Sequence, residues 1–491
     1  MALRTLFKRL EIPRETDEFV GLWVVTGAFN VGGWMTGSSV IALGLNVWQA
    51  MLTVIIGNIL VGIICVLTGA PGAKWHVGFS ILQNASWGMY GALFPLVQRI
   101  MLSFIWYSTQ VWWGGQCTKT FLTALWPSFR NLNTPLAHGT MDTGDLTAFI
   151  VFWSLCLPLI WVPPEKYKIP FAIAACSVAP TVLALMICQS DFTRFSRRPG
   201  DQLLSQLLFV PLSTVSVALI GILCTSCASQ LFPETNGTLL WEPYRMLATV
   251  QTHFDDSPRA RVAVAFASLA FAVAQFGIAV AENALSNGID LSALVPRYFN
   301  LRRGGYLTAV FAFVMQPWEL MNGASNFLTV MGGYGVFLGS MTGVMFSDYY
   351  LVRQRRLMLT GLYDASSTSI YWYWLGVNWR APVAWLAATW LLLPGFVRRV
   401  QDPTAEWNGW SHLYYMSWPL GCFLAMLFYY LLARAFPVPQ PQAVDDADYF
   451  GTFGLANDFG SVLEGEAVSG NGSLAKKDQA VLSSEEMNQA V

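Results

Sequence analysis

The residues best suited to chemistry are a large aromatic side chain and a neutral amide in a long apolar stretch. Trp106 and Gln110 are four residues apart in the sequence WYSTQ, and their surroundings are otherwise suited to lipid. On a helix this spacing places both side chains on one face, one above the other. A buried amide in hydrocarbon is costly unless a partner binds it. The pair therefore predicts a pocket for a flat, uncharged ring that forms hydrogen bonds, as in a carrier of small heterocycles.

A second candidate feature lies in the first apolar stretch, where Asn30 and Trp34 stand among several glycines. Irregular backbone at membrane depth is tolerated where it is buried in protein or lines a cavity, and broken helices of this kind form the midplane sites of secondary transporters. The alternative is close helix packing through small residues. Because Asn30 and Trp34 accompany the glycines, we favour a cavity. The glycines are Gly27, Gly32, Gly33 and Gly37.

The composition places the chain among polytopic membrane proteins. Hydrophobic residues make up 54% of the sequence and charged residues 12%, against ~25% charged residues in a typical soluble chain. The net charge of −1 gives no reason to expect a nucleic-acid partner. We therefore expect an all-α protein embedded in a lipid bilayer.

Eleven stretches are long and apolar enough to cross a bilayer, which requires about 20 residues each. They define a cytoplasmic N-terminal segment (1–18), a transmembrane domain (19–436) and a C-terminal tail (437–491). The tail is rich in Pro, Gly, Ser and acidic residues, which is typical of a disordered cytoplasmic linker; the alternative is a sorting or turnover signal. The expected spans are 19–45, 47–69, 94–126, 146–163, 169–188, 204–230, 260–285, 306–322, 324–348, 380–398 and 413–436.

Basic residues predict the orientation of these spans, because cytoplasmic loops contain an excess of Lys and Arg. The basic first residues place the N-terminus in the cytoplasm, and four spans return the chain there at Lys166 and Lys168. The basic loop 194–198 should also be cytoplasmic, yet the stretch before it, 169–188, is too short for two crossings. One span is therefore missing, unless 169–188 is re-entrant or the later basic loops face outward. A cytoplasmic loop 194–198 would put the glycosylation sequon at Asn236 outside.

A set of short motifs resembles the nucleobase:cation symporter family of uracil, allantoin, cytosine and hydantoin permeases, and in particular its fungal uracil/allantoin branch. The motifs occur in family order from about residue 19 to 436. The resemblance implies twelve helices, ten of which form two inverted five-helix repeats with broken first and sixth helices and work by alternating access. The motifs are NVGGWMTGSSVIALGL (30–45), PG (71–72), SWGM (86–89), WYSTQ (106–110), GGQ (114–116), DFTR (191–194), LRRG (301–304), PW (317–318), DYY (348–350) and GVNWR (376–380).

The resemblance also implies a ring-binding site. The family's aromatic residue and Gln on the third helix match Trp106 and Gln110, and its eighth-helix Asn matches Asn283. Each amide offers an acceptor and donors in one plane, which complement the N–H and C=O edges of a uracil-like or hydantoin-like ring. Together with Asn30 and Trp34, these residues are the expected substrate-binding set.

A co-transported proton is expected rather than sodium. Sodium-coupled relatives use eighth-helix hydroxyls about one turn before the Asn, where this chain has Phe276, Gly277 and Ile278, which offer no side-chain oxygen to a hard cation. Glu282 is an ionisable group in or near an apolar helix and is the candidate coupling residue; the alternative is that it meets water at a helix end. Tyr334 on the expected tenth helix is the candidate gate.

Three departures from the family pattern bear on activity. Relatives have a further helix before the DFTR motif, which supplies a second aromatic to sandwich the ring, whereas here Cys188 almost directly precedes Asp191. This places the missing span at the sixth helix and leaves about eleven. Relatives also have a Pro-rich segment before the first helix, which is absent here. Both gaps are typical of lost coding segments, as in a mispredicted intron or a splice variant. Asn84 stands where relatives usually have an Arg.

We interpret the chain as a plasma-membrane permease that moves a nucleobase or related heterocycle, such as uracil or allantoin, with a proton and no cofactor or metal. The alternatives are a truncated, non-transporting paralogue and a nutrient receptor that keeps the ring pocket. An enzyme is not expected, because the histidines are scattered outside the spans. One methylene or hydroxyl in a pocket changes selectivity by only ~1–3 kcal/mol, so the sequence does not select the heterocycle. The histidines are His76, His138, His253 and His412.

Overall fold

The computed structural model describes residues 30–161, 190, 193, 200–235, 238–321, 324–402 and 408–440. Within these residues the chain is helical apart from loops and one short antiparallel hairpin, as the composition predicts. Several predictions concern residues outside the described ones. These are the N-terminal segment, the first part of span 19–45, the stretch 169–188 beside the missing span, the sequon at Asn236 and most of the tail.

The first helices follow the predicted spans, with one start inside a span. α3 begins in the middle of span 19–45, because Asn30 is extended and its Oδ1 accepts a hydrogen bond from the Gly33 N–H at 2.6 Å. This cap fixes a helix start at the position where the glycines predicted irregular backbone. The elements up to the first gap are α3 (Val31–Ala42), α4 (Val47–Trp75), α5 (Phe79–Trp87), α6 (Leu93–Leu125), η1 (Pro127–Asn131), β1 (Pro135–Leu136), η2 (Ala137–Gly139), β2 (Met141–Asp142) and α7 (Thr143–Trp161).

The second half contains two long helical stretches that change to π-helical geometry along their length. α13, η6 and α14 follow one another from Pro258 to Leu294, and η7 extends α17 in the same way. Its elements are α10 (Asp201–Leu204), η4 (Ser205–Phe209), α11 (Val210–Leu231), η5 (Pro233–Thr235), α12 (Pro243–His253), α13 (Pro258–Gly277), η6 (Ile278–Leu285), α14 (Ser286–Leu294), α15 (Leu301–Val314), α16 (Pro317–Leu320), α17 (Ala324–Phe346), η7 (Ser347–Val352), α18 (Leu359–Tyr363), α19 (Arg380–Gln401), α20 (Gly409–Tyr415) and α21 (Ser417–Ala435).

The structure corrects the predicted span 306–322, which is not one helix. α15 ends at Val314, Gln316 has left-handed backbone with φ 47°, and Pro317 begins the short α16. A proline has no N–H to donate, and its ring disfavours helical backbone at the residue before it. The helix therefore stops before Pro317 although the apolar run continues.

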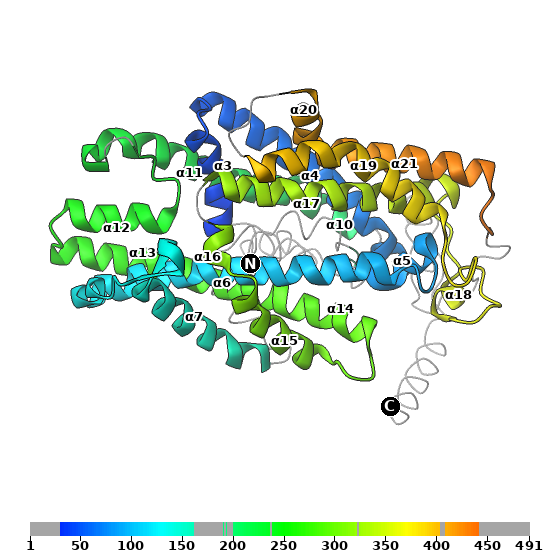
Figure 1. Cartoon of the computed structure of the whole chain (residues 1–491), viewed down its shortest axis with the longest axis horizontal. Coiled ribbons are helices and arrows are strands. Elements are labelled where there is room, and N and C mark those ends of the chain that lie inside the picture. Colours follow the sequence, from blue (N-terminus) through cyan, green and yellow to red (C-terminus); the bar gives the residue numbers. More distant parts are fainter. Residues whose placement is uncertain are drawn as a thin grey trace, which may run out of the picture. The chain divides into compact units, whose positions relative to one another are not determined.

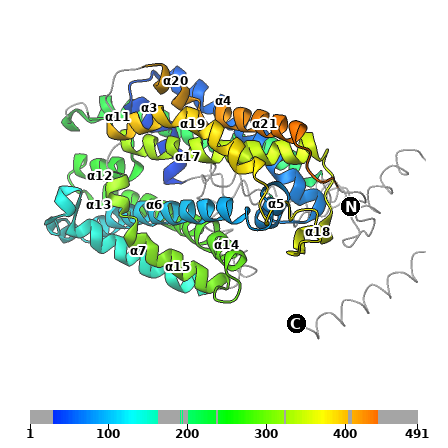
Figure 2. The ribbon, with the colours of Figure 1, turned by 45° about the vertical axis from the view of Figure 1, so that its right-hand side comes forward.

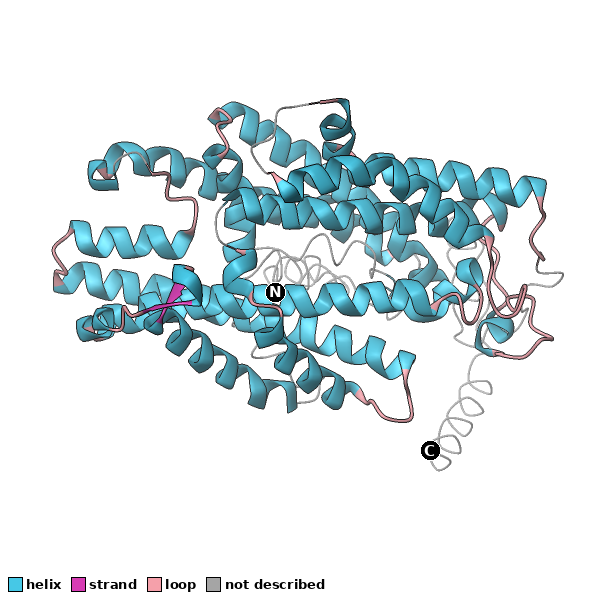
Figure 3. Ribbon diagram, viewed as in Figure 1, coloured by secondary structure: helices cyan, strands magenta, loops and turns pink. Residues whose placement is uncertain are grey.

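α6 lies at the centre of the helical unit. In two views it runs between a layer of α17, α19 and α21 on one side and α7 and α15 on the other (Figures 1 and 2). It packs against α13, α7, α15 and η6, and the hairpin of β1 and β2 is small beside these helices (Figure 3). Many residues of α6, from Pro95 to Ala124, are thereby buried.

The central position of α6 explains its polarity. Six helical stretches of the described chain are long and apolar enough to cross a membrane, and α6 is not among them although it has 33 residues. It contains polar side chains such as Arg99 and Gln110, both buried. A helix that contacts protein instead of lipid can hold such groups, because neighbouring helices can satisfy them. The six stretches are Val47–Trp75, Thr143–Trp161, Gln206–Ala228, Pro258–Leu294, Arg380–Gln401 and Ser417–Ala435.

Two glycines set the distance between α3 and α11. A Cβ atom on Gly37 would lie 2.4 Å from the Ala218 carbonyl oxygen, and one on Gly221 would lie 2.5 Å from the Trp34 carbonyl oxygen. Neither distance is possible for a real side chain, so the two backbones touch only because these residues are glycines. Close packing therefore accounts for Gly37, the alternative to a cavity that the sequence left open.

Three of the sequence motifs meet in one buried network near α5. Arg353 pairs with Asp348 at 2.8 Å, and the Tyr429 hydroxyl donates to the other carboxylate oxygen at 2.8 Å. The Asn378 amide donates to the Tyr429 hydroxyl at 2.9 Å and to the Ser86 carbonyl oxygen at 2.7 Å. The SWGM, DYY and GVNWR motifs are therefore parts of one structure that joins α5, η7, α21 and the start of α19.

The start of the C-terminal tail is bound to the same end of the helical unit. The Arg380 guanidinium donates to the carbonyl oxygens of Phe436 at 2.7 Å and Pro437 at 3.2 Å. Arg353 donates to the Pro439 carbonyl oxygen at 3.3 Å. The ordered domain thus continues a few residues beyond the predicted boundary at 436.

Candidate functional site

α6 buries both members of the predicted aromatic and amide pair. Trp106 is 6% exposed and Gln110 is fully buried, and the helix is continuous through both. Spacing of four residues on an unbroken helix puts them one turn apart on the same face, as predicted. The Trp106 indole N–H has no hydrogen-bond partner among the described residues.

Gln110 meets a second buried amide that the sequence analysis did not single out. The Gln275 Nε2 on α13 donates to the Gln110 Oε1 at 2.9 Å, and both side chains are fully buried. The Gln110 Nε2 and the Gln275 Oε1 have no hydrogen-bond partner within the described chain. The same signal that identified Gln110, a neutral amide in an apolar span, could have identified Gln275.

Asn283 lies in the π-helical segment η6, which packs against α6. Its side chain is buried, and its Nδ2 donates to the Ile278 carbonyl oxygen five residues earlier at 3.0 Å. Trp106 belongs to the same apolar cluster as Ala279 and Val280 of this segment. The structure thus brings the elements of Trp106, Gln110 and Asn283 together, with the Asn283 amide donor occupied by the backbone. Single π-turns inside α-helices occur frequently at functional sites.

Asn30 and Trp34 belong to α3, whose start faces α13 and α6. The Asn30 Oδ1 caps the helix, while its Nδ2 and the Trp34 indole N–H have no partner among the described residues. The Trp34 ring contacts Phe271 of α13 edge-on, with centroids 6.2 Å apart. Gly32 lies beside the Trp113 ring of α6. The three helices that hold the predicted residues are therefore mutual neighbours.

Several buried polar atoms at this candidate site have no hydrogen-bond partner among the described residues. Among the predicted binding residues on α3 and α6 together with Gln275, four of these atoms are N–H donors and one, the Gln275 Oε1, is an acceptor. A buried polar group without a partner costs about 1–3 kcal/mol, and nearly all such groups in proteins are satisfied. A neutral molecule with several carbonyl oxygens and at least one N–H would satisfy them. The donors are the Nε1 atoms of Trp34 and Trp106, the Nδ2 of Asn30 and the Nε2 of Gln110.

The candidate coupling and gate residues lie close to this set along the chain. Glu282 is half-buried in η6, next to Asn283. Phe276 stacks on Phe152 of α7 with ring centroids 4.1 Å apart, so its position serves apolar packing. Tyr334 of α17 lines a hollow of about 380 Å³ that Ile105, the neighbour of Trp106, also lines. The structure does not test a coupling or gating role for any of them.

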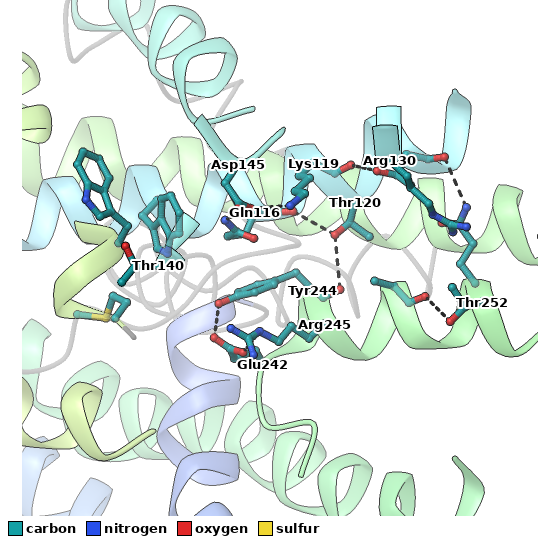
Figure 4. A pocket seen from close by; sticks show the side chains of 16 residues that line it. Gln116, Lys119, Thr120, Arg130, Thr140, Asp145, Glu242, Tyr244, Arg245 and Thr252 are labelled. Carbon is teal, nitrogen blue, oxygen red and sulfur yellow. Dashed lines mark hydrogen bonds and ion pairs between the residues drawn. The ribbon is translucent and has the colours of Figure 1, made fainter. Parts of the chain in front are cut away.

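A separate polar pocket lies at the end of α6 that α12 covers, opposite to α5 (Figure 4). It has a volume of about 320 Å³ and is lined by Trp112 and Trp318 as well as by charged side chains. Lys119 pairs with Asp142 at 2.7 Å and with Asp145 at 2.9 Å. The sequence analysis missed this pocket, because its residues come from loops and helices far apart in the chain.

Glu242 is the most buried carboxylate of the pocket. It is 2% exposed, pairs with Arg245 and accepts a hydrogen bond from the Tyr244 hydroxyl. Burial raises the pKa of the Glu242 carboxyl above its ordinary value, although Arg245 and the Tyr244 hydroxyl act in the opposite direction. The pocket therefore holds its charges as internal pairs.

Comparisons with known proteins agree with the motifs. A family profile described as "Permease for cytosine/purines, uracil, thiamine, allantoin" matches residues 14–185 and 170–421. The allantoin permease of Saccharomyces cerevisiae is 31% identical over 464 residues, which cover 84% of this chain and 72% of that protein. The uracil permease of the same organism is 31% identical over 485 residues, which cover 88% of this chain and 76% of that protein.

Solved structures match the fold. Mhp1, a nucleobase-cation-symport-1 family transporter in a closed conformation with bromovinylhydantoin bound, has a TM-score of 0.65 at 16% identity. The match covers 89% of this chain and 96% of that one. The inward facing conformation of Mhp1 gives a TM-score of 0.66 at 17% identity. The predicted all-α polytopic transporter fold is thus confirmed.

The two segments matched by the family profile overlap. Residues 170–185 belong to both of them. One stretch of this chain is therefore aligned with two parts of the family profile.

Proposed function

Because the chain belongs to the nucleobase:cation symporter family of permeases for cytosine and purines, uracil, thiamine and allantoin, we propose that it carries uracil, allantoin or a closely related ring. The chain is a multi-pass membrane transporter and not an enzyme, as the sequence predicted. The proposed mechanism is symport with a proton by alternating access in the plasma membrane, with the N-terminus in the cytoplasm.

One observation supports the proposed binding site above all others. Gln110 is fully buried at the centre of the unit, with Trp106 one turn away and its own Nε2 unpaired in the described chain. An indole face next to an amide donor suits a planar ring with a carbonyl oxygen. A neutral site also avoids placing a charge inside the membrane.

The lack of side-chain oxygens at three positions supports the proposed coupling to a proton. Phe276, Gly277 and Ile278 have no side-chain oxygen for sodium, and Phe276 is stacked on Phe152. Glu282, half-buried beside Asn283, is the proposed proton carrier. Tyr334 is the proposed gate, since it lines a hollow that also borders α6 next to Trp106.

The second candidate function is that of a binding protein that does not transport. The overlap of the two profile matches at 170–185 favours it, because a chain that lacks one helix of the family would be aligned in this way. Loss of the sixth helix would remove the second aromatic side chain that sandwiches the ring in relatives. It would also invert the orientation of all later spans in the membrane. Such a chain could still hold a ring between Trp106 and Gln110 and serve as a nutrient receptor.

Uptake and binding measured side by side test both functions. The full chain is produced in yeast cells without their own uracil and allantoin permeases, and both radiolabelled compounds are offered to cells and to isolated membranes. Saturable uptake supports the transporter, and binding without uptake supports the receptor. Neither binding nor uptake would contradict both.

The variant Gln110→Ala tests the site. We expect it to abolish uptake and to weaken binding more than tenfold, because it removes the only predicted amide donor on α6 that the described chain leaves unpaired. The control is Asn58→Ala, at another buried amide, whose Nδ2 donates to the Val54 carbonyl oxygen at 2.9 Å within α4. Unchanged affinity in Gln110→Ala would remove Gln110 from the site.

A further inference from the structure

The bond between Gln110 and Gln275 determines which hydrogen-bonding group each amide still offers. A carboxamide has an acceptor oxygen and a donor nitrogen. The Gln275 Nε2 donates to the Gln110 Oε1 at 2.9 Å, so that Gln110 keeps its donor and Gln275 keeps its acceptor. Both remaining groups are buried, and neither has a partner among the described residues.

This arrangement also couples the orientation of Gln110 to that of Gln275. A lone buried glutamine can turn its amide and present either group, since its last torsion angle is broad and roughly two-fold. Turning the Gln110 amide here would face its NH₂ group toward the Gln275 NH₂ group and replace a hydrogen bond by two opposed donors. The two amides can therefore turn only together, and in either orientation the pair presents one donor and one acceptor.

We propose that Gln275 is a second substrate-recognition residue. Gln110 and Gln275 together recognise a cyclic amide, that is, a ring carbonyl next to a ring N–H. In this arrangement the Gln110 Nε2 donates to a ring carbonyl oxygen, and the Gln275 Oε1 accepts from the neighbouring ring N–H. The proposal rests on the proposed function, because it concerns the same site, and it names the chemical feature that the site selects. The ring must be neutral at that edge and must keep its N–H.

The burial of the two amides supports recognition by direct contact. Each side chain is fully buried, and Gln275 lies between Ala274 and Phe276 in an otherwise apolar segment of α13. An amide oxygen without a partner in such surroundings is destabilising, and an incoming N–H would remove this cost. A site built to bond an N–H rejects an analogue without it far more strongly than an apolar pocket rejects an extra methyl group.

The test compares methylated ligands rather than variants alone. Binding of uracil, 1-methyluracil and 3-methyluracil to the full chain is measured for the wild type and for Gln275→Met, which keeps the size of the side chain. We expect one of the two methyl groups to weaken binding to the wild type at least tenfold. In Gln275→Met we expect uracil itself to bind at least tenfold more weakly and that methyl group to change the affinity less than threefold.

Two further variants separate recognition from folding. Gln275→Glu keeps acceptor oxygens at this place but loses the N–H that donates to Gln110, so it should bind uracil more weakly than the wild type while retaining the discrimination against the methylated ring. Ser268→Ala removes a buried hydroxyl of α13 that donates within its own helix to the Val264 carbonyl oxygen at 2.6 Å, and it should behave like the wild type. If Gln275→Met does not fold, Gln275→Glu alone decides, and loss of discrimination in a folded Gln275→Glu overturns the proposal.

The outcomes distinguish this proposal from the proposed function. If the wild type binds none of the three rings, nor allantoin, the proposed function fails and this inference fails with it. If the wild type binds uracil but neither methyl group weakens binding, or if Gln275→Met discriminates as strongly as the wild type, only the role of Gln275 is overturned.

Discussion

The candidate site consists of individual amides and indoles, with Glu282 as an ionisable neighbour of Asn283. Gln110 and Gln275 join α6 to α13 by one hydrogen bond of 2.9 Å. In the polar pocket at the end covered by α12, charged side chains form ion pairs. Glu242 pairs with Arg245, and Lys119 pairs with Asp142. Neutral amides at the candidate site, together with ion pairs in this pocket and between Asp348 and Arg353 near α5, limit unpaired charge inside the membrane.

Glu242 gives a prediction about pH. Its raised pKa means that burial disfavours the carboxylate, so the protonated group stabilises the fold below its ordinary pKa, and this contribution is lost as the pH rises through the raised value. Glu242→Gln removes the charge and keeps an oxygen for the Tyr244 hydroxyl. We expect its thermal midpoint in detergent to exceed that of the wild type by an amount that grows from acidic to neutral pH.

A control variant at Asp364 should change the thermal midpoint in the opposite direction. Asp364 is an exposed carboxyl whose pKa is lowered by hydrogen bonds from the side chain and backbone of Ser366. Its contribution is present above its ordinary pKa and is lost as the pH falls, so Asp364→Asn should lower the midpoint slightly, and only toward neutral pH. A Glu242→Gln midpoint that stays below the wild type at neutral pH would contradict the assignment.

Single residues could be predicted from the sequence only where their own surroundings indicated them. Trp106, Gln110 and Asn283 were identified by spacing and by family motifs, and all three are buried in packed helices. Gln275 was not identified, because its importance comes from a partner 165 residues away. Asn30 was expected to face a substrate, and the structure shows that half of its amide caps α3.

Helices in this protein approach one another through glycine. Gly221 of α11 faces the Trp34 carbonyl oxygen, and Gly37 of α3 faces the Ala218 carbonyl oxygen. Since Trp34 is one of the proposed binding residues, the spacing of these helices also positions the site.

A single methyl group at this contact should therefore be harmful. Gly221→Ala places a Cβ 2.5 Å from the Trp34 carbonyl oxygen, and overpacking of this kind costs about 1–3 kcal/mol. We expect a lower thermal midpoint and weaker uracil binding. The matched control is Gly57→Ala on α4, where a Cβ would meet no atom within 4 Å. Equal midpoints for the two variants would show that α3 and α11 can separate at little cost.

The helices themselves were largely predictable, and the exceptions have physical causes. Hydropathy located most spans, because lipid contact requires apolar side chains over the length of a crossing. It could not detect the break before Pro317, since a turn there changes no apolar residue. It also could not show that α6 is central, because that position depends on the packing of α7, α13, α15 and η6 around it.

The whole helical unit is held together near α5 by the buried pair of Asp348 and Arg353. Both side chains are nearly inaccessible, and their network reaches Tyr429, Asn378 and Ser86. Three sequence motifs that the family resemblance identified one by one are therefore one assembly. This could not be predicted from the sequence, because contacts across 51 to 292 residues leave no local pattern.

Breaking this pair should destabilise the entire unit. Asp348→Asn leaves the buried Arg353 charge without its carboxylate. Such a change typically lowers the free energy of unfolding by about 3–5 kcal/mol. We expect loss of monodisperse protein or a strongly lowered midpoint, and partial recovery in the double variant Asp348→Asn, Arg353→Met. Glu319→Gln, at an exposed carboxylate, is the control. A double variant less stable than Asp348→Asn alone would contradict the explanation.

The carbonyl oxygens of Phe436, Pro437 and Pro439 accept hydrogen bonds from Arg380 and Arg353, and Arg353 belongs to the network that holds the unit together. Shortening the protein to end at Ala435 would strip both guanidinium groups of these acceptors, whereas a fluorescent reporter joined after Gln440 would leave them in place. The minimal version worth producing for crystallisation or cryo-microscopy therefore stops no earlier than Gln440.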